Sequence, residues 1–489
     1  MTTVVLRGAG TRIHDIVRIA QDGTAIAVAE ETRARLQRAR AILETAARDG
    51  QQIYGMNTGL GANLNTPVSA DFEAFQFSII RGRGAAVGEP LTRAQTRAVM
   101  AARLSMLAVA GSGISPAVFD ALVSLVNAGI HPVLPSIGSI GAGDLVLLSG
   151  MARALVGEGE VEFRGDVRPA AQALAEAGLE PAILGPKDGI SLLNASAVSV
   201  GLACLVLSDT ALLLDRQRQA AALSFEALGG NPSIFTAAIQ QARPAPRQAE
   251  EAAHLLKQLE GSELLERQPH AIQDPLSFRC IAPVHAVAAD ALAKAQEIVE
   301  IELNAAADNP LVILSEERVL STGNFHTPAL SLAFETLALA VAHVAHASAA
   351  RFVHLTGAGR NGLPRYLSRM GGSSAGFVPM QKTVVSLHAA IRHDANPVML
   401  DGLPVSEGAE DLATQSVLAV RKFANILDHW QLLIACELLA SAQALDFRSG
   451  HRPGSGVQKT HRYVRAIVPC AIEDRPLGDD VAALNQILR

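Results

Sequence analysis

The sequence predicts a mainly α-helical protein whose centre is a bundle of long helices. Of its 489 residues, 49% are hydrophobic, whereas only 4% are aromatic and 18% are charged. This composition is typical of a well-buried helical chain rich in Ala, Leu and Val. Long segments such as residues 286–304 and 330–355 repeat apolar side chains at helical spacing. We expect the bundle to occupy residues 198–447, between an N-terminal domain at 1–197, which is smaller and mixed in structure, and a helical tail at 448–489.

Charge and cysteine content exclude several classes of partner. The net charge of −6 provides no electrostatic basis for binding nucleic acid or an anionic membrane. The N-terminus lacks the basic and apolar regions of a signal peptide, and the apolar run at 329–342 is interrupted by Glu335 and is short for a membrane span. Four cysteines lie far apart and match no zinc or thioredoxin spacing, which indicates reduced thiols and a cytoplasmic protein: Cys204, Cys280, Cys436 and Cys470.

The smaller elements are predicted in chain order. Residues 1–25 alternate apolar and polar positions and predict a short strand pair or an irregular lead-in. Residues 28–49 predict a helix that Gly50 ends, and residues 71–128 predict helices broken near 81–90. A hairpin followed by a helix is expected over 157–181, and a loop with one final helix over 451–489.

Two glycine-rich loops are the candidate functional segments. In the first, residues 135–150, Gly141 and Gly143 lead into an apolar helix from Leu145, and Asp144 is a candidate N-cap. The second, residues 54–61, reads Tyr-Gly-Met-Asn-Thr-Gly-Leu-Gly and carries one phenol. Taken alone, the first is a tight loop with a helix cap, and Tyr54 is a turn tyrosine that packs its ring.

Both loops resemble signature segments of the histidine and aromatic amino acid ammonia-lyase family. Residues 138–145 are similar to that family's Gly-Ser-Val-Gly-Ala-Ser-Gly-Asp-Leu, and residues 54–61 to its Tyr-Gly-Val-Asn-Thr-Gly-Phe-Gly. The resemblance continues along nearly the whole chain, through residues 187–195, 273–280, 302–305, 308–310, 323–326 and 474–480. It implies the family's helical fold and a homotetramer whose active sites draw residues from three chains.

The first loop lacks one residue of the family pattern. In the family, Ala-Ser-Gly cyclises to methylidene-imidazolone, and its serine supplies the methylidene carbon. Here Ala142 is followed directly by Gly143 and Asp144. Because glycine has no β-carbon and Ser139 stands too early in the motif, we expect no methylidene-imidazolone and no other cofactor or metal.

The resemblance assigns the roles of the remaining site residues. Tyr54 would remove the substrate's β-proton, from a loop whose mobile glycines, including Gly61 at the substrate, let it close. A phenol can act as a base only if cations or donors stabilise its charged form. Arg279 would bind the substrate carboxylate, and Glu410 would lie beside the ring or the amine. These three side chains are the candidate catalytic residues: Tyr54, Arg279 and Glu410.

Three further residues would line the pocket. Gln273 would donate a hydrogen bond there. Asn194 would be a donor near the carboxylate or amine, although asparagine at a helix start is more often a cap. Phe325 would lie against the prosthetic loop and the substrate, or else be one more core phenylalanine.

This chain departs from the family at positions that shape the pocket. Arg83 falls where histidine- and tyrosine-specific members carry a histidine, and Leu276 replaces a tyrosine. Lys382 stands where the family has a small apolar residue. Each cation has a second interpretation: Arg83 as a solvated surface residue, and Lys382 as a core-edge lysine that reaches water. Gly372–Gly376 also fits the hydrolase pattern Gly-x-Ser-x-Gly, but no strand is predicted before it.

These features together predict a lyase for a trimethylated betaine. A quaternary ammonium has no lone pair for an electrophile, yet it leaves as a neutral amine. Arg83 and Lys382 would stabilise negative charge on a thione-bearing imidazole, so the expected reaction converts ergothioneine to thiourocanate and trimethylamine; hercynine is a related possible substrate. Two alternatives stay open: an ammonia-lyase or aminomutase for a primary aromatic amino acid such as histidine, and an inactive binding homologue.

Overall fold

The chain folds into two compact units, each assembled from three separate segments. The computed structural model describes residues 3–63, 68, 71–269, 271–357 and 362–488. Unit 1 consists of Met1–Ser208, Gln296–Leu332 and Pro397–Arg421, and unit 2 of Asp209–Ala295, Ala333–Asn396 and Lys422–Arg489. The predicted division at 197 and 447 cuts the chain into consecutive parts, whereas the segments of these two units alternate along the chain.

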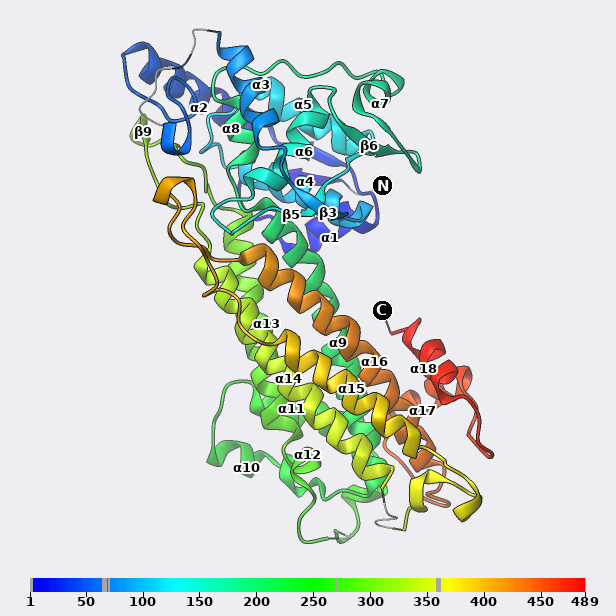
Figure 1. Ribbon diagram of the computed structural model, residues 1–489. Helices are drawn as coiled ribbons and strands as arrows, with labels where there is room; N and C mark the ends of the chain where they lie inside the picture. The colour runs from blue at the N-terminus through cyan, green and yellow to red at the C-terminus, as the bar shows by residue number, and fades with distance from the viewer. Residues whose placement is uncertain (1–2, 64–67, 69–70, 270, 358–361, 489) are drawn as a thin grey trace. The chain divides into compact units, whose positions relative to one another are not determined.

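Unit 1 combines helices with small sheets of two or three strands (Figure 1). β1 pairs in parallel with β2, and β3 pairs with β5, β4 with β6, β6 with β7, and β8 with β9, all antiparallel. Its strands are β1 (Val4–Leu6), β2 (Ile26–Val28), β3 (Val87–Pro90), β4 (Ile130–Pro132), β5 (Pro135–Ile137), β6 (Glu160–Phe163), β7 (Asp166–Pro169), β8 (Leu311–Ile313) and β9 (Arg318–Leu320). Its helices are α1 (Ile13–Gln21), α2 (Glu30–Arg48), α3 (Phe72–Gly82), α4 (Arg93–Ala108), α5 (Pro116–Asn127), α6 (Leu145–Leu155), α7 (Ala170–Glu176) and α8 (Asp188–Leu193), with 3₁₀ turns η1 (Gly61–Asn63) and η6 (Ser406–Gly408).

Of the strand pair predicted within residues 1–25, only β1 lies there; its partner β2 follows at Ile26–Val28, after a helix that was not predicted. Helix α1 separates β1 from β2 and buries Ile13, Ile16 and Ile19. Its first turn is held by Asp15, whose carboxylate accepts from the Arg12 backbone N–H at 3.0 Å. Isoleucines three residues apart mark a helical face, which the apolar–polar alternation of residues 1–25 concealed.

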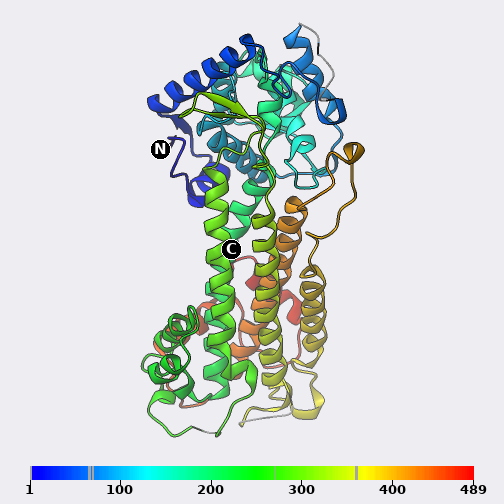
Figure 2. The same ribbon diagram turned by 90° about the vertical axis from the view of Figure 1, so that its left-hand side faces the viewer.

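Four long helices contribute residues to both units: α9 (Ala197–Leu228), α13 (Ile281–Leu303), α14 (Pro328–Leu355) and α16 (Ser416–Leu445). In unit 2 their portions run alongside α15 (Val378–Asp394), as Figures 1 and 2 show. The buried carboxylate of Glu437 on α16 accepts from Arg351 Nε of α14 at 2.6 Å and from Gln217 of α9 at 2.7 Å. This satisfied buried network joins three helices of the predicted bundle.

Short helices complete unit 2. They are α10 (Ala237–Ala242), α11 (Gln248–Gln258), α12 (Leu276–Arg279), α17 (Ser455–Ile467) and α18 (Leu477–Asn485), with 3₁₀ turns η2 (Pro232–Phe235), η3 (Glu263–Leu265), η4 (Arg365–Leu367) and η5 (Gly371–Ser373). The tail at 448–489 therefore contains two helices, α17 and α18, whereas the sequence predicted one. Arg465 on α17 donates to Asp446 at 2.7 Å and fastens this tail to the residues after α16.

Two helical stretches, Asp188–Leu228 and Pro328–Leu355, are long and apolar enough to cross a membrane. Most of each apolar window is buried within the protein, as it is in the core helices of folded domains. Cytoplasmic location stays a prediction.

Candidate active site

Hydrogen bonds within residues 53–61 hold the Tyr54 loop in shape. The Tyr54 hydroxyl accepts from the backbone N–H of Gly61 at 2.9 Å, which closes the loop on itself. Asn57 stiffens the turn, because its Oδ1 accepts from the Ile53 N–H at 2.7 Å. A backbone donor aimed at the phenol oxygen stabilises its charged form more than its neutral form. Tyr54 itself is half-buried.

Arg83 lies close enough to Tyr54 and Glu410 to interact with their charges. It follows α3 directly, as the C-cap residue, and is half-buried, whereas Arg81 is exposed and pairs with Glu158. Burial lowers the pKa of the Arg83 guanidinium, and the charges of Tyr54 and Glu410 oppose that shift. Of the two interpretations made from the sequence, a solvated surface arginine describes Arg81 better than Arg83.

Glu410 belongs to a tight turn that lies beside the Tyr54 loop. Its carboxylate accepts from the Ser406 hydroxyl at 2.5 Å, and its backbone bridges to Val405. The turn contains η6, which packs against η1 at the end of the Tyr54 loop. Glu410, Arg83 and Tyr54 thus come together from three segments that are distant in the sequence.

The loop that resembles the prosthetic-group segment is clamped on several sides. The Thr414 hydroxyl donates to Gly141 O at 2.9 Å, and the N–H groups of Thr414 and Gln415 both donate to Ile140 O. On another side, Ala142 forms a β-bridge with His326. A β-carbon on Gly141 would lie 2.0 Å from the Thr414 hydroxyl oxygen, so only glycine fits there.

Asp144 has a different capping role from the one predicted. It occupies the N-cap position of α6, but its side chain makes no capping bond to that helix. Instead its Oδ2 accepts from the Val198 and Ser199 N–H groups at 2.9 and 3.0 Å, at the start of α9. Burial raises the pKa of the Asp144 carboxyl, and these bonds, with one from Ser139, oppose that shift. Asp144 therefore fixes the loop to the first turn of a long helix.

Asn194 and Phe325 lie at this same loop. Asn194 follows α8 as its C-cap, not at a helix start, and donates from Nδ2 to Asn309 O at 2.9 Å. Its Oδ1 is 3.2 Å from where a β-carbon of Gly143 would stand. The Phe325 carbonyl accepts from Ser196 Oγ at 3.1 Å, and Phe325 precedes the residue that bridges Ala142. Within unit 1 the structure brings the predicted residues into two clusters, one around Tyr54 and one around Gly143.

The remaining predicted residues belong to unit 2. Arg279 ends α12 and is partly exposed, and Gln273 lies exposed just before that helix. Lys382 is exposed on α15. The hydrolase motif at Gly372–Gly376 also belongs to unit 2: its Ser374 hydroxyl donates to Asp474 at 2.5 Å, and the residues described just before it form 3₁₀ turns instead of a strand.

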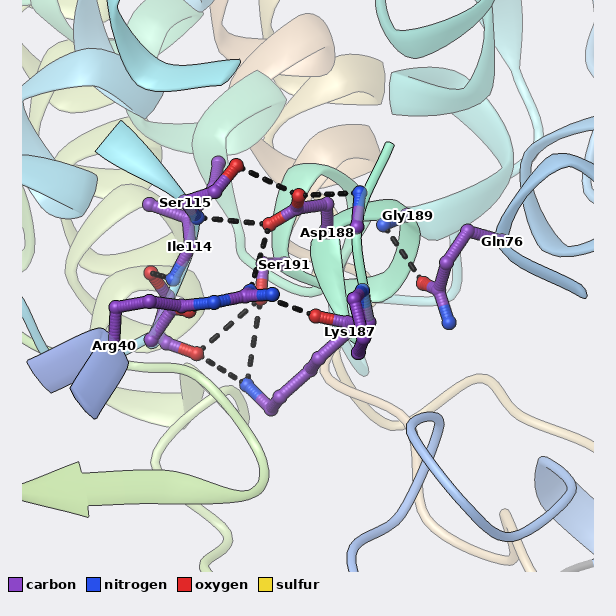
Figure 3. Close-up of polar contacts among 12 residues, drawn as sticks. Arg40, Gln76, Ile114, Ser115, Lys187, Asp188, Gly189 and Ser191 are labelled. Atoms are coloured by element: carbon purple, nitrogen blue, oxygen red, sulfur yellow. Dashed lines mark hydrogen bonds and ion pairs between the residues drawn. The ribbon is translucent and has the colours of Figure 1, made fainter. Parts of the chain in front are cut away.

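A buried polar network surrounds the start of α8 and was not predicted from the sequence (Figure 3). Asp188 accepts from the Ser115 N–H at 2.8 Å and from the Ser115 hydroxyl at 2.7 Å, and it pairs with Arg40. The ammonium of Lys187 donates to Ser112 O, and burial lowers the pKa of Lys187 to about 8. Charged residues within the otherwise apolar segment 187–195 were the available signal, because buried charges need partners.

The residues present do not fit the family's prosthetic group. Gly143 has no β-carbon to become a methylidene, and the Ser139 hydroxyl is occupied: it accepts from the Gly141 N–H at 3.0 Å and donates to Asp144 at 2.7 Å. No step through methylidene-imidazolone can be derived from these side chains.

Comparison with known proteins covers the whole chain. The aromatic amino acid lyase family matches residues 11–466. A histidine ammonia-lyase from Caldanaerobacter subterraneus subsp. tengcongensis is 33% identical, over 100% of this chain and 97% of its own. Among solved structures, the ergothioneine-degrading enzyme ergothionase from Treponema denticola, in complex with desmethyl-ergothioneine sulfonic acid, superimposes with a TM-score of 0.95 at 29% identity, covering 100% and 98% of the two chains. Tyrosine aminomutase from Streptomyces globisporus gives a TM-score of 0.94 at 28% identity, covering 100% and 97%.

Proposed function

Because the chain belongs to the aromatic amino acid lyase family and is therefore a carbon–nitrogen lyase, we propose that it eliminates trimethylamine from ergothioneine without a prosthetic group. The observation that carries this proposal is that Gly143 directly follows Ala142. In the family a serine follows that alanine and supplies the carbon of the electrophile. A trimethylammonium nitrogen has no lone pair to give an electrophile. A lyase for such a substrate needs a base and an anchor for the carboxylate, but no methylidene-imidazolone.

In the proposed reaction Tyr54 takes the proton from the β-carbon. The electrons of that C–H bond form the Cα–Cβ double bond, and the electrons of the C–N bond leave with neutral trimethylamine, giving thiourocanate. Before the proton transfer, the Gly61 N–H and the Arg83 guanidinium stabilise the charged form of the phenol. Arg83 also stabilises negative charge that spreads onto the thione-bearing ring as the proton leaves.

The proposed site is completed by other subunits of a homotetramer. Arg279 binds the substrate carboxylate, and Gln273 and Lys382 line the pocket from neighbouring chains. Exposed apolar residues on unit 2 helices favour such association. Leu339 and Val353 on α14 are 55% and 38% exposed and lie two turns on either side of the exposed His346. Apolar side chains repeated at this spacing form a face that a second helix can cover.

A second candidate is an ammonia-lyase acting on histidine. The observation in its favour is the set of histidine ammonia-lyases at 33–36% identity over nearly the full length of this chain. Against it stands the loop at Ala142–Gly143, which has no serine to dehydrate. A third possibility, an inactive binding homologue, is disfavoured by the presence of both Tyr54 and Arg279.

Turnover assays with three substrates test the proposal. Purified protein is incubated in parallel with ergothioneine, hercynine and histidine, while the conjugated product is followed by absorbance, and trimethylamine and ammonia by mass spectrometry. We expect trimethylamine and a red-shifted product from ergothioneine. Ammonia from histidine, or turnover of none of the three, would contradict the proposal.

Intact-mass measurement tests the cofactor prediction separately. We expect the mass that the sequence dictates. A deficit equal to two waters, with a new near-ultraviolet absorbance, would show that the loop cyclises after all.

A further inference from the structure

Gln76 is a fully buried amide that joins the Tyr54 loop to helix α8. Its Nε2 donates to Gly55 O at 3.0 Å, and Gly55 follows Tyr54 directly. Its Oε1 accepts from the Gly189 N–H at 2.8 Å, in the first turn of α8 (Figure 3). Both ends of this one side chain are therefore engaged by backbone, one in a loop and one in a helix.

The two joined segments approach each other closely. A β-carbon on Gly189 would lie 2.9 Å from Gln76 Oε1, and one on Gly55 would lie 2.9 Å from Ile190 Cγ2. Glycine at both positions allows contacts that a larger residue would push apart. The bonds made by Gln76 thus set the distance between the Tyr54 loop and α8.

Gln76 is attached to elements that carry three predicted site residues. It belongs to α3, and Arg83 caps the C-terminal end of that helix. Asn194 follows helix α8 as its C-cap. The Lys187 and Asp188 network fixes α8 in the core, so this helix is a rigid reference for the loop.

We propose that Gln76 is a positioning residue that holds the Tyr54 loop in register with Arg83 and Asn194. The inference rests on the proposed role of Tyr54 as base. Without the bond to Gly55 O, the loop loses its buried anchor while the substrate anchors stay unchanged. A shift of about 1 Å in a catalytic group can cost about 100-fold in rate, so we expect kcat to fall about 10- to 100-fold and KM to change little.

Two substitutions separate the bonds that Gln76 makes. Gln76→Leu removes both bonds. Gln76→Glu keeps an acceptor for the Gly189 N–H, but its ionised carboxylate cannot donate to Gly55 O. When that buried carboxyl is protonated, it can donate again. The ratio of kcat for Gln76→Glu to kcat for the wild type should therefore rise as pH falls, whereas the ratio for Gln76→Leu stays flat.

Gln248→Leu is the matched control. Gln248 is also a buried amide engaged at both ends, since it donates to Gln240 Oε1 and accepts from Arg243, each at 2.8 Å, but it belongs to α11 of unit 2. Its replacement removes similar bonds away from the Tyr54 loop. We expect its kcat to match the wild type.

Hydrogen exchange of residues 50–63 provides a readout independent of turnover. We expect faster exchange in both Gln76 variants and wild-type exchange in Gln248→Leu, with circular dichroism confirming that all are folded. Unchanged exchange in Gln76→Leu, or faster exchange with unchanged kcat, would overturn the proposal. If the wild type turns over no substrate, only the proposed function fails, because the exchange measurement still decides whether Gln76 anchors the loop.

Discussion

The surroundings of Tyr54 are the basis for proposing it as the residue that removes a proton from carbon. One backbone N–H is aimed at its oxygen, and a guanidinium and a carboxylate lie nearby. Burial lowers the pKa of the Arg83 guanidinium, and the charges of Tyr54 and Glu410 both oppose that shift. In the proposed mechanism, the cation that replaces the family's histidine therefore supports the base as well as contacting the substrate.

Replacement of Tyr54 by phenylalanine should abolish most turnover and leave binding intact. General-base catalysis contributes about 10²- to 10⁴-fold, and the phenol ring keeps its packing in Tyr54→Phe. Steady-state kinetics measure the loss, and calorimetry with ergothioneine measures the affinity. Tyr463→Phe is the control, because its hydroxyl donates to Ile487 O on the surface of unit 2. Unchanged turnover in Tyr54→Phe would refute its role as base.

His285 makes stability depend on pH. It is fully buried on α13, neither ring nitrogen has a hydrogen-bond partner among the described residues, and burial lowers its pKa well below 6.5, helped by Arg351 and Arg218. Below pH 6.5 the unfolded chain takes up a proton that the folded chain does not, so stability falls as pH falls.

Between pH 7.5 and pH 5 this single group should cost about 2 kcal/mol of unfolding free energy. Denaturant unfolding at both values measures it, and His285→Leu should lose that much less on acidification. His254→Gln, at an exposed position, should behave as the wild type. A steep loss that persists in His285→Leu would assign the pH dependence to other groups.

The residues that lie at the two clusters were predictable where a motif contains them, and a residue was missed where contacts distant in the sequence decide its place. Tyr54, Asn194 and Phe325 lie in segments with family patterns, and each lies at one of the two clusters. Gln76 belongs to no pattern recognised in the sequence, and its importance comes from Gly55 and Gly189, which are distant along the chain.

At the scale of elements, the loop at 138–144 shows why local signals mislead. Asp144 before an apolar run predicts a cap for α6, yet the carboxylate caps α9, more than fifty residues later. Helix α1 and the second tail helix were missed for a related reason: short helices receive much of their stability from packing, which periodicity alone does not reveal. The long helices were predicted correctly because their apolar pattern is sustained over many turns.

Gly141→Ala should destabilise this loop far more than backbone strain explains. An alanine at φ +81° costs about 1–2 kcal/mol, and its β-carbon would also collide with Thr414, so we expect several times that loss, with little soluble protein. Gly178→Ala is the control for strain alone, because Gly178 has φ +68° and no atom within 4 Å of a β-carbon. Equal losses in the two variants, measured by denaturant unfolding, would show that Thr414 moves aside freely.

At the scale of the whole molecule, the residues proposed as base and as carboxylate anchor belong to different units, with Tyr54 in unit 1. Arg279, which the family resemblance assigns to that task, belongs to unit 2. The sequence predicts both residues, because each lies in its own motif, and in the proposed homotetramer they come together from different chains. If one site takes Tyr54 from one chain and Arg279 from another, two different inactive variants can complement each other.

Co-expression of Tyr54→Phe chains with Arg279→Met chains, each with its own tag, tests this arrangement. Each variant alone should be nearly inactive. In randomly mixed tetramers a site works when one chain supplies Tyr54 and another supplies Arg279, so about one quarter of the wild-type activity should return. Two differently tagged Tyr54→Phe chains provide the control and should recover nothing. If doubly tagged tetramers are purified and remain inactive, Tyr54 and Arg279 act within one chain, and the shared-site proposal is wrong.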